Sequence, residues 1–160
     1  MSIDRRGGEH LRRAISIAVE NVRSGNGGPF GAVIVREGVA IAEAVNRVTA
    51  SHDPTAHAEI GAIRAACAQL GTHDLSGCEI YASCEPCPMC LGAIYWARLS
   101  RLYFAASHED ATRAGFDDSF LYGQIGLAPR ERSIATVRAL AREGLAPFRA
   151  WRESAVKIPY

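Results

Sequence analysis

The sequence of 160 residues lacks the features that direct a protein to a membrane or to a nucleic acid. No apolar run is long enough to span a bilayer, and the first residues lack the apolar core of a signal peptide. The formal net charge is only +1, so no overall basic field favours phosphates or an anionic membrane. We therefore expect a cytoplasmic protein that binds neither a membrane nor a nucleic acid.

Cysteine is scarce and unevenly placed. There are five cysteines, an odd number, and Cys84, Cys87 and Cys90 fall within one short window. In a reducing compartment this clustering favours metal ligation over disulfides. The composition, 48% apolar and 22% charged, is otherwise that of a soluble globular protein. We see no internal repeat or linker, and we expect residues 1–160 to form one domain.

The spacing of apolar residues predicts alternating helices and strands. Strands are expected near residues 32–35, 40–45, 79–83 and 101–106, the first two as a hairpin around Glu37 and Gly38. Helices are expected over residues 11–22, from His57 to Gly71, and from Pro88 to Arg98, with shorter ones over 107–115 and near the C-terminus. Residues 134–140 could be strand or helix. The core-facing residues are expected to be Leu11, Ala14, Ile15, Ala18, Val19 and Val22 in the first helix, and Ile60, Ile63, Cys67 and Leu70 in the second.

The order strand, helix, strand around Pro88–Arg98 implies parallel pairing of the two strands. The expected fold is therefore α/β, a three-layer α/β/α architecture with a mixed central sheet of about five strands.

Two short motifs suggest a metal site. Cys87 and Cys90 form a Cys-x-x-Cys pair, and His57 stands two residues before Glu59. Alone, the cysteine pair would equally suit a redox or a structural role. Three nitrogen and sulfur ligands leave one position open, which is typical of catalytic zinc, and His-x-Glu with Pro-Cys-x-x-Cys is the pattern of zinc deaminases. We predict that Zn²⁺ is bound by His57, Cys87 and Cys90.

Glu59 is not needed as a ligand, and we predict it to be the catalytic residue that moves protons to the substrate. His57 and Glu59 can converge on one metal only at the start of a helix, because in mid-helix they would point to nearly opposite faces. Cys84 could replace Cys87 as ligand, but its place at the end of a strand favours a position behind the metal. The remaining histidines have no partner pattern, and surface or capping roles are expected for His10, His52, His73 and His108.

The motifs resemble those of the cytidine deaminase-like superfamily and, more narrowly, its bacterial guanine deaminases. The general likeness lies in residues 53–59, 85–90 and 92–98. The narrower likeness lies in residues 27–32, 114–120 and 147–152, with Tyr160 at the end.

This resemblance implies that Asn46 and the backbone at Ala58 hold a purine base, that Phe30 stacks on it, and that Asp118 reads its edge. Trp96 and Tyr160 are further substrate-binding residues that the resemblance implies. It also implies a homodimer in which the C-terminal segment, about residues 143–160, crosses to the partner subunit. Phe148, Trp151 and Tyr160 would then close the neighbouring site.

A physical argument supports the role of Asp118. Guanine presents an N1–H and a 2-amino group side by side, and a carboxylate can accept hydrogen bonds from both. Adenine and cytosine lack this pair of donors, so an unpaired carboxylate would penalise them. The alternative is that Asp117 and Asp118 only cap a turn.

The expected function is zinc-dependent hydrolysis of the nucleobase guanine to xanthine and ammonia. A tRNA adenosine deaminase shares the run 53–59, but it should carry a basic surface for phosphates. Cytosine and aminotriazine deaminases use the same chemistry and are further alternatives. A non-catalytic zinc-binding fold would have no use for the carboxylate of Glu59.

Overall fold

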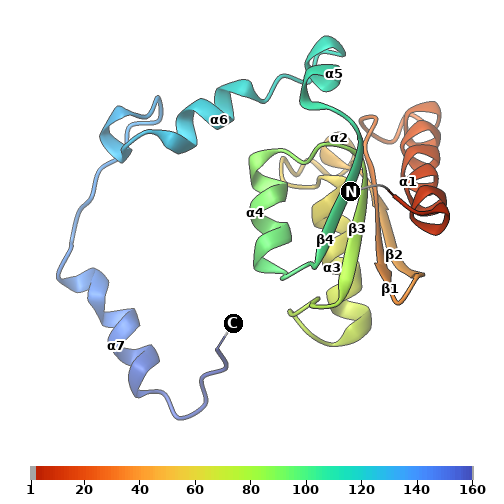
Figure 1. Cartoon of the computed structure of the whole chain (residues 1–160). Coiled ribbons are helices and arrows are strands. Elements are labelled where there is room, and N and C mark those ends of the chain that lie inside the picture. Colours follow the sequence, from red (N-terminus) through yellow and green to blue (C-terminus); the bar gives the residue numbers. More distant parts are fainter. Residues whose placement is uncertain (1–2, 160) are drawn as a thin grey trace. The chain divides into compact units, whose positions relative to one another are not determined.

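The computed structural model describes residues 3–159, which divide into two compact units, Met1–Asp118 and Ser119–Tyr160 (Figure 1). The elements of the first unit are α1 (Arg5–Arg23), β1 (Gly31–Arg36), β2 (Val39–Val45), α2 (Val48–Ser51), α3 (Ala58–Leu70), β3 (Cys78–Cys84), α4 (Pro88–Trp96), β4 (Arg101–Ala106) and α5 (His108–Arg113). The second unit contains α6 (Ser119–Gly126), η1 (Pro129–Glu131), η2 (Glu143–Leu145) and α7 (Ala146–Glu153). Within residues 3–159 no helix has both the length and the apolar character required to cross a membrane.

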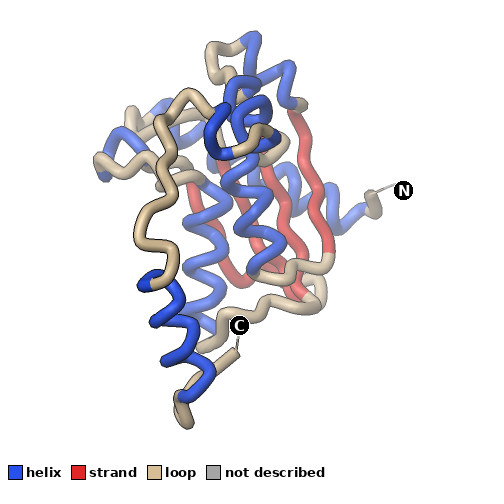
Figure 2. Tube along the Cα trace, turned by 90° about the vertical axis from the view of Figure 1, so that its left-hand side faces the viewer, coloured by secondary structure: helices blue, strands red, loops and turns tan. Residues whose placement is uncertain are grey.

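The first unit is built on one mixed sheet with the strand order β2-β1-β3-β4 (Figure 2). The predicted hairpin of β1 and β2 is confirmed, and Glu37 and Gly38 both have positive φ angles, 52° and 77°, as a two-residue turn between twisted strands requires. β1 pairs antiparallel with β3, and β3 pairs parallel with β4 on either side of α4, also as predicted. The described residues form four strands, so the expectation of about five was too high. Residues 134–140 form neither strand nor helix.

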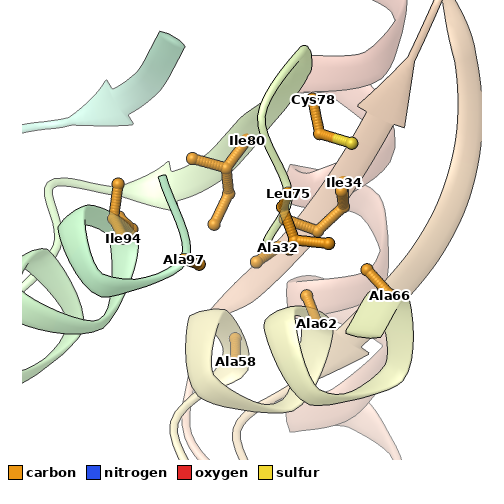
Figure 3. Close-up of a cluster of buried hydrophobic side chains, with 10 residues drawn as sticks. All are labelled: Ala32, Ile34, Ala58, Ala62, Ala66, Leu75, Cys78, Ile80, Ile94 and Ala97. Carbon is orange, nitrogen blue, oxygen red and sulfur yellow. The ribbon is translucent and has the colours of Figure 1, made fainter. Parts of the chain in front are cut away.

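Both faces of the central strands are covered, which gives the predicted α/β/α layers. Alternate residues of β1 point to opposite faces. Ile34 packs in a cluster with α3 and α4 (Figure 3), and Val33 packs on the other face with α1. Helix α1 lies on one side of the sheet, and α3 and α4 lie on the other (Figure 1). Such strands are continuously apolar because neither face meets water.

Helix α1 packs with a face that is rotated from the predicted one. Ala14, Ile17 and Ala18 are buried, whereas Ile15 and Val19 remain 39% and 41% exposed. The reason is a close approach at Gly31, where a Cβ atom would lie 2.4 Å from the carbonyl oxygen of Ala14. The missing side chain lets this part of the helix rest directly on the start of β1.

Helix α3 also buries small residues rather than the large ones that periodicity favoured. Ala58, Ala62 and Ala66 have no exposed surface, while Ile63, Cys67 and Leu70 pack partly buried around them. These alanines are four residues apart and form one face of the helix. A helix with an alanine face can lie close to the sheet, and this brings the first turn of α3, with Glu59, close to the sheet as well.

The second unit has no core of its own. None of its described residues is buried, and Ile134 and Val137 are 79% and 85% exposed. A segment of this size cannot normally bury enough apolar surface to be stable alone. The single domain and the exchange of residues 143–160 between subunits stay predictions.

Candidate active site

The two sequence motifs begin two helices, as predicted. His57 is the residue before α3, and Cys87 is the residue before α4, whose first residue is Pro88. Proline suits this position because its missing N–H would have no helical partner there. Helix starts carry a partial positive charge and therefore favour thiolates and carboxylates nearby.

The side chains of His57, Cys87 and Cys90 come together as one group that can hold a metal ion, which we call the metal group. Nδ1 of His57 lies 3.6 Å from Sγ of Cys87 and 3.5 Å from Sγ of Cys90. A tetrahedral zinc ion, with Zn–S of about 2.3 Å and Zn–N of about 2.0–2.1 Å, holds its sulfur and nitrogen ligands about 3.6 Å apart. The donor atoms and their spacing therefore fit Zn²⁺.

The electrostatics of this group favour a negative sulfur. A hydrogen bond from Cys90, together with the nearby His57, lowers the pKa of Cys87 to about 4, although burial opposes the shift. The hydrogen bond to Cys87 and burial raise the pKa of Cys90. The same contact with Cys87 raises the pKa of His57. One thiolate is thus present at neutral pH, and a bound metal ion deprotonates a coordinating thiol outright.

Glu59 lies beside this group in the first turn of α3. Its side chain is buried, and Oε2 accepts a hydrogen bond from Sγ of Cys90 at 3.4 Å. Burial raises the pKa of Glu59, because a low-dielectric environment disfavours the charged carboxylate. A carboxyl group with a raised pKa can both take up and release a proton near neutral pH.

Cys84 stands apart from the three ligand atoms. Its Sγ donates a hydrogen bond to the backbone oxygen of Ser107 at 3.6 Å, and burial raises the pKa of Cys84 to about 11. It is therefore a neutral thiol at the end of β3. Among the described residues the metal group contains Cys87 and not Cys84. Cys78 is buried and Cys67 packs against the core, as expected.

A cavity of about 650 Å³ opens beside these residues, a size typical of small-molecule sites. It is lined by His57 and Cys87 of the metal group, by Glu59, and by Phe30, Asn46 and Asp118. The other lining residues are Gly25, Gly27, Gly28, Val48, Thr49, Cys84, Glu85, His108, Ala111, Gly115, Phe116 and Asp117.

Asn46 is held in the cavity wall by backbone groups. Its Oδ1 accepts hydrogen bonds from the N–H groups of Gly28 and Val48, at 3.2 and 3.3 Å. Nδ2 of Asn21, a buried residue of α1, donates to the carbonyl oxygens of Gly28 and Asn46, both at 2.9 Å. With Oδ1 engaged, the amide nitrogen is the group that Asn46 can offer to a ligand.

Comparison with known proteins agrees with this site. The model of the cytidine and deoxycytidylate deaminase zinc-binding region matches residues 6–106, a range that includes the three predicted ligands and Glu59. The chain belongs to this deaminase family.

Individual relatives differ in how much of the chain they match. The guanine deaminase of Bacillus subtilis (strain 168) is 56% identical over 150 residues, covering 94% of this chain and 96% of the relative. An X-ray structure of guanine deaminase from Bacillus subtilis superposes with a TM-score of 0.94 at 53% identity over 99% of both chains. A tRNA-specific adenosine deaminase of Agrobacterium fabrum (strain C58) is 50% identical over only 78 residues, 49% of this chain and 51% of the relative.

Only some of the predicted substrate residues that the structure describes line the cavity. Phe30, Asn46 and Asp118 line the cavity. Ala58 is the first residue of α3, with its side chain in the core, so only its backbone could meet a ligand. Trp96 is 69% exposed at the end of α4 and is not among the described residues that line the cavity. Tyr160 lies outside the described residues.

Three residues of the site were missed by sequence reasoning. His108 was expected at the surface or in a cap, but it lines the cavity beside Asp118. Phe116 meets the ring of Phe30 edge to face, with centroids 5.0 Å apart, so two aromatic rings border the cavity. Asn21 supports Asn46 from α1. Asn21 could have been found from the sequence, because it lies at helical spacing from Ala14, Ile17 and Ala18 and therefore on the same buried face of α1.

Proposed function

We propose that this protein is a zinc-dependent guanine deaminase, which hydrolyses guanine to xanthine and ammonia. The observation that carries the proposal is the presence in one cavity of Asp118 together with the metal group and Glu59. The 56% identity to the guanine deaminase of Bacillus subtilis, over nearly all of both chains, supports it.

The metal group sets the place of the reaction. Zinc held by His57, Cys87 and Cys90 would supply Lewis acidity, which lowers the pKa of a water molecule strongly, to about 7. In hydrolysis a bond forms between the water oxygen and C2 of guanine, and the bond between C2 and the amino nitrogen breaks. The ligands at the two helix starts fix where C2 must lie.

Glu59 is proposed to move the protons. Its carboxylate takes a proton from the attacking water and gives it to N3, which gains an electron pair when oxygen adds to C2. The carboxylate then takes the second proton from the hydroxyl group on C2 and transfers it to the amino nitrogen, so that ammonia leaves and a C2 carbonyl remains. The burial of Glu59 and its raised pKa suit a group that is protonated and deprotonated within one cycle.

The base is proposed to be bound by its edge and its faces. Asp118 accepts hydrogen bonds from N1–H and the 2-amino group, and the amide of Asn46 donates to a ring acceptor. Phe30 and Phe116 border the cavity with their rings, which suits stacking on a flat base. Trp96 is proposed to contribute only at the periphery, since its side chain is 69% exposed.

A homodimer is proposed for the whole molecule, with the segment of about residues 143–160 reaching the site of the partner. Phe148, Trp151 and Tyr160 would then form a lid. The support is the exposed apolar surface of the second unit, where Phe148 and Val156 are 63% and 88% exposed. Such surface normally marks an interface. Cytoplasmic location stays a prediction.

The test is direct. Purified protein with bound zinc should convert guanine to xanthine, followed by ultraviolet absorbance and by release of ammonia. Deamination of adenosine in tRNA without any turnover of guanine would contradict the proposal and favour the tRNA adenosine deaminase alternative.

A further inference from the structure

His108 and Asp118 form a pair in the cavity wall. Nδ1 of His108 lies 2.5 Å from Oδ1 of Asp118, and the side chains are only 29% and 22% exposed. Oδ1 of Asp118 is completely shielded from solvent and has no hydrogen-bond partner of normal geometry among the described residues, so its contact with His108 is an ion-pair contact. The imidazole therefore occupies one oxygen of the carboxylate, and Oδ2 is the oxygen left for a ligand.

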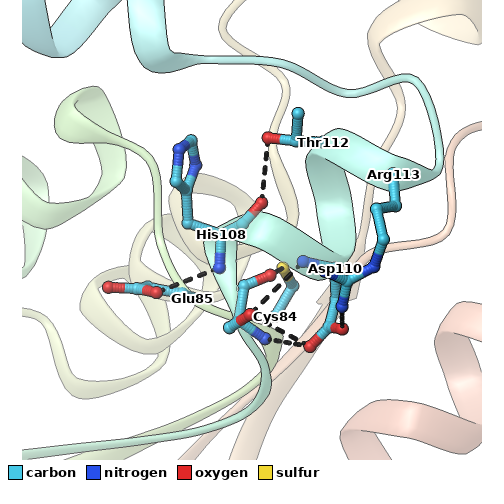
Figure 4. A network of polar contacts seen from close by, with 7 residues as sticks. Cys84, Glu85, His108, Asp110, Thr112 and Arg113 are labelled. Atoms are coloured by element: carbon cyan, nitrogen blue, oxygen red, sulfur yellow. Dashed lines mark hydrogen bonds and ion pairs between the residues drawn. The ribbon is translucent and has the colours of Figure 1, made fainter.

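His108 is itself fixed to the strand that carries the metal loop. Its backbone N–H donates to Oε2 of Glu85 at 3.0 Å (Figure 4). The backbone N–H of Glu85 in turn donates to the carbonyl oxygen of Ala106 at 2.9 Å. Glu85 stands two residues before the ligand Cys87. The backbone of His108, from which the imidazole extends, is thus held at a defined place relative to the metal group.

Further hydrogen bonds at Ser107 hold the connection between β4 and α5 in place. Ser107 and Asp110 form a reciprocal capping box, and the thiol of Cys84 donates to the backbone oxygen of Ser107 (Figure 4). A capping box satisfies two backbone N–H groups that the helix leaves unpaired. His108, the first residue of α5, therefore starts from a rigid backbone.

Asp118 needs such support because of its own position. It is the last residue of the loop 114–118, and the last torsion of an aspartate side chain is broad and roughly two-fold. Without a fixed partner, the carboxylate could rotate and present either oxygen at different angles. Side chains that read a ligand need their rotamers locked by supporting hydrogen bonds.

We propose that His108 is the positioning residue for Asp118. Its Nδ1 lies against Oδ1 as the charged or hydrogen-bonding partner of that oxygen, and this contact orients Oδ2 toward the N1–H and 2-amino edge of guanine. The chain Glu85, His108, Asp118 thereby links base recognition to the loop that carries Cys87. This inference rests on the proposed function, because it assigns Asp118 to the edge of guanine.

Substitutions at His108 test the role by the position of the donor. Phenylalanine keeps a ring but removes the donor, and it should lower kcat/KM for guanine about 10- to 100-fold, as expected for a misplaced binding group. His108→Asn places an amide nitrogen close to the position of Nδ1, so its kcat/KM should be close to that of the wild type. His108→Gln places its nitrogen farther out, so its kcat/KM should lie between those of the asparagine and phenylalanine variants. The matched control is His10→Phe, because His10 contacts Tyr81 away from the cavity, and it should not change kcat/KM.

A double-mutant cycle tests whether His108 acts through Asp118. In an Asp118→Asn background, His108→Phe should lower kcat/KM less than about twofold further, since residues in one network are not additive. Full additivity of the two losses would overturn the positioning role. Equal kcat/KM of His108→Phe and the wild type would overturn it as well.

A spectroscopic readout separates this inference from the proposed function. Imidazole ¹⁵N–¹H spectra should show a proton on Nδ1 of His108, with a chemical shift that changes in Asp118→Asn. A bare Nδ1, or a shift unaffected by that substitution, would overturn the pair even in an enzyme that hydrolyses guanine. An intact signature in a wild type that does not hydrolyse guanine would contradict the proposed function instead.

Discussion

Glu59 is buried, and its carboxyl group contacts the thiol of Cys90, a predicted metal ligand. A carboxyl group in such a place is destabilised in its charged form and becomes useful as a proton carrier. The metal ligands His57, Cys87 and Cys90 can be assembled without it, since their donor atoms already fit a tetrahedral ion.

Glu59→Gln should therefore retain zinc but lose turnover. Glutamine keeps the size of the side chain and cannot exchange a proton, so kcat for guanine should fall about 10²- to 10⁴-fold. Metal content by atomic spectroscopy and ammonia release measure the two effects separately. The control is Glu109→Gln on the exposed side of α5, which should match the wild type. Wild-type turnover in Glu59→Gln would disprove the proton-transfer role.

The contrast between Glu59 and His108 shows what the sequence could predict at this scale. His57 and Glu59, like Cys87 and Cys90, are so close in the chain that their spacing alone constrains their geometry. His108 and Asp118 are ten residues apart, across a helix and a loop, so their contact depends on the path of residues 114–118. No local pattern encodes that path, so the contact of His108 with Asp118 was not predicted.

The loop between α1 and β1 is the element that shapes the side of the cavity where Asn46 lies. A Cβ atom on Gly27 would lie 2.1 Å from the carbonyl oxygen of Asn46 and 3.0 Å from Nδ2 of Asn21. No side chain fits there unless the backbone moves. The loop and Asn46 are thus held together by a contact that only glycine permits.

Gly27→Ala should weaken both the fold and the reaction. Displacing the backbone at Asn46 should cost about 1–3 kcal/mol of unfolding free energy, the usual cost of overpacking, and should raise KM for guanine. Chemical denaturation and steady-state kinetics measure these effects. At Gly28 the nearest atoms to an added Cβ are 3.4 Å away, so Gly28→Ala serves as the stability control. Equal stability of Gly27→Ala and the wild type would contradict the close approach.

Helix α1 is also fastened to β2 by an ion pair that should respond to pH. Two parallel hydrogen bonds, of 2.8 and 2.5 Å, join Arg13 to Glu43, and they lower the pKa of Glu43. Because the folded pKa is the lower one, the pair stabilises the fold above the unfolded value of about 4.3 and loses its effect as pH falls through the folded value.

Glu43→Gln should consequently lower the unfolding free energy at pH 7 by less than about 1 kcal/mol, since the pair is partly exposed. The difference from the wild type should shrink as the pH is lowered below about 4.3. Urea denaturation at several pH values measures it, with Glu37→Gln on the β1–β2 turn as the control. A difference that grows toward acid pH would contradict the assignment.

The four described strands and the longer helices were predicted from the sequence, whereas α2 and α6 were not. The faces that the predicted helices bury were not always predicted correctly. Apolar periodicity located α1 and α3 correctly and then favoured their large side chains, Ile15 and Val19 among them, for the core. The structure buries the small residues instead, because Gly31 and the alanines of α3 permit close packing against the sheet. How closely two elements approach is a tertiary property, which the pattern of one helix does not contain.

The whole molecule combines a unit that has a core with a unit that has none. The sheet and its three covering helices lie in Met1–Asp118, and the second unit leaves its apolar side chains exposed. The sequence suggested a possible strand at residues 134–140, but β-branched residues alone do not form a strand without a partner to pair with. A second copy of the chain is the proposed cover for this unit.

Removing the last three residues, 158–160, should then reduce guanine turnover while leaving zinc bound, because the proposed lid is shortened and the ligands all lie in the first unit. Light scattering should give twice the chain mass for the wild type. The truncated protein is compared with Val156→Ala, which changes one exposed side chain and keeps the full length. Unchanged turnover after truncation, or a monomer in solution, would argue against closure by a partner subunit.

The most direct test of the central claim is a panel of substrates with one readout. Purified zinc protein is offered guanine, adenine, cytosine, the corresponding nucleosides, an aminotriazine and tRNA, and ammonia is measured for each. We predict that guanine is deaminated with a kcat/KM far above that of the others, with xanthine as the second product. Ammonia from tRNA or from another base, together with none from guanine, would contradict it.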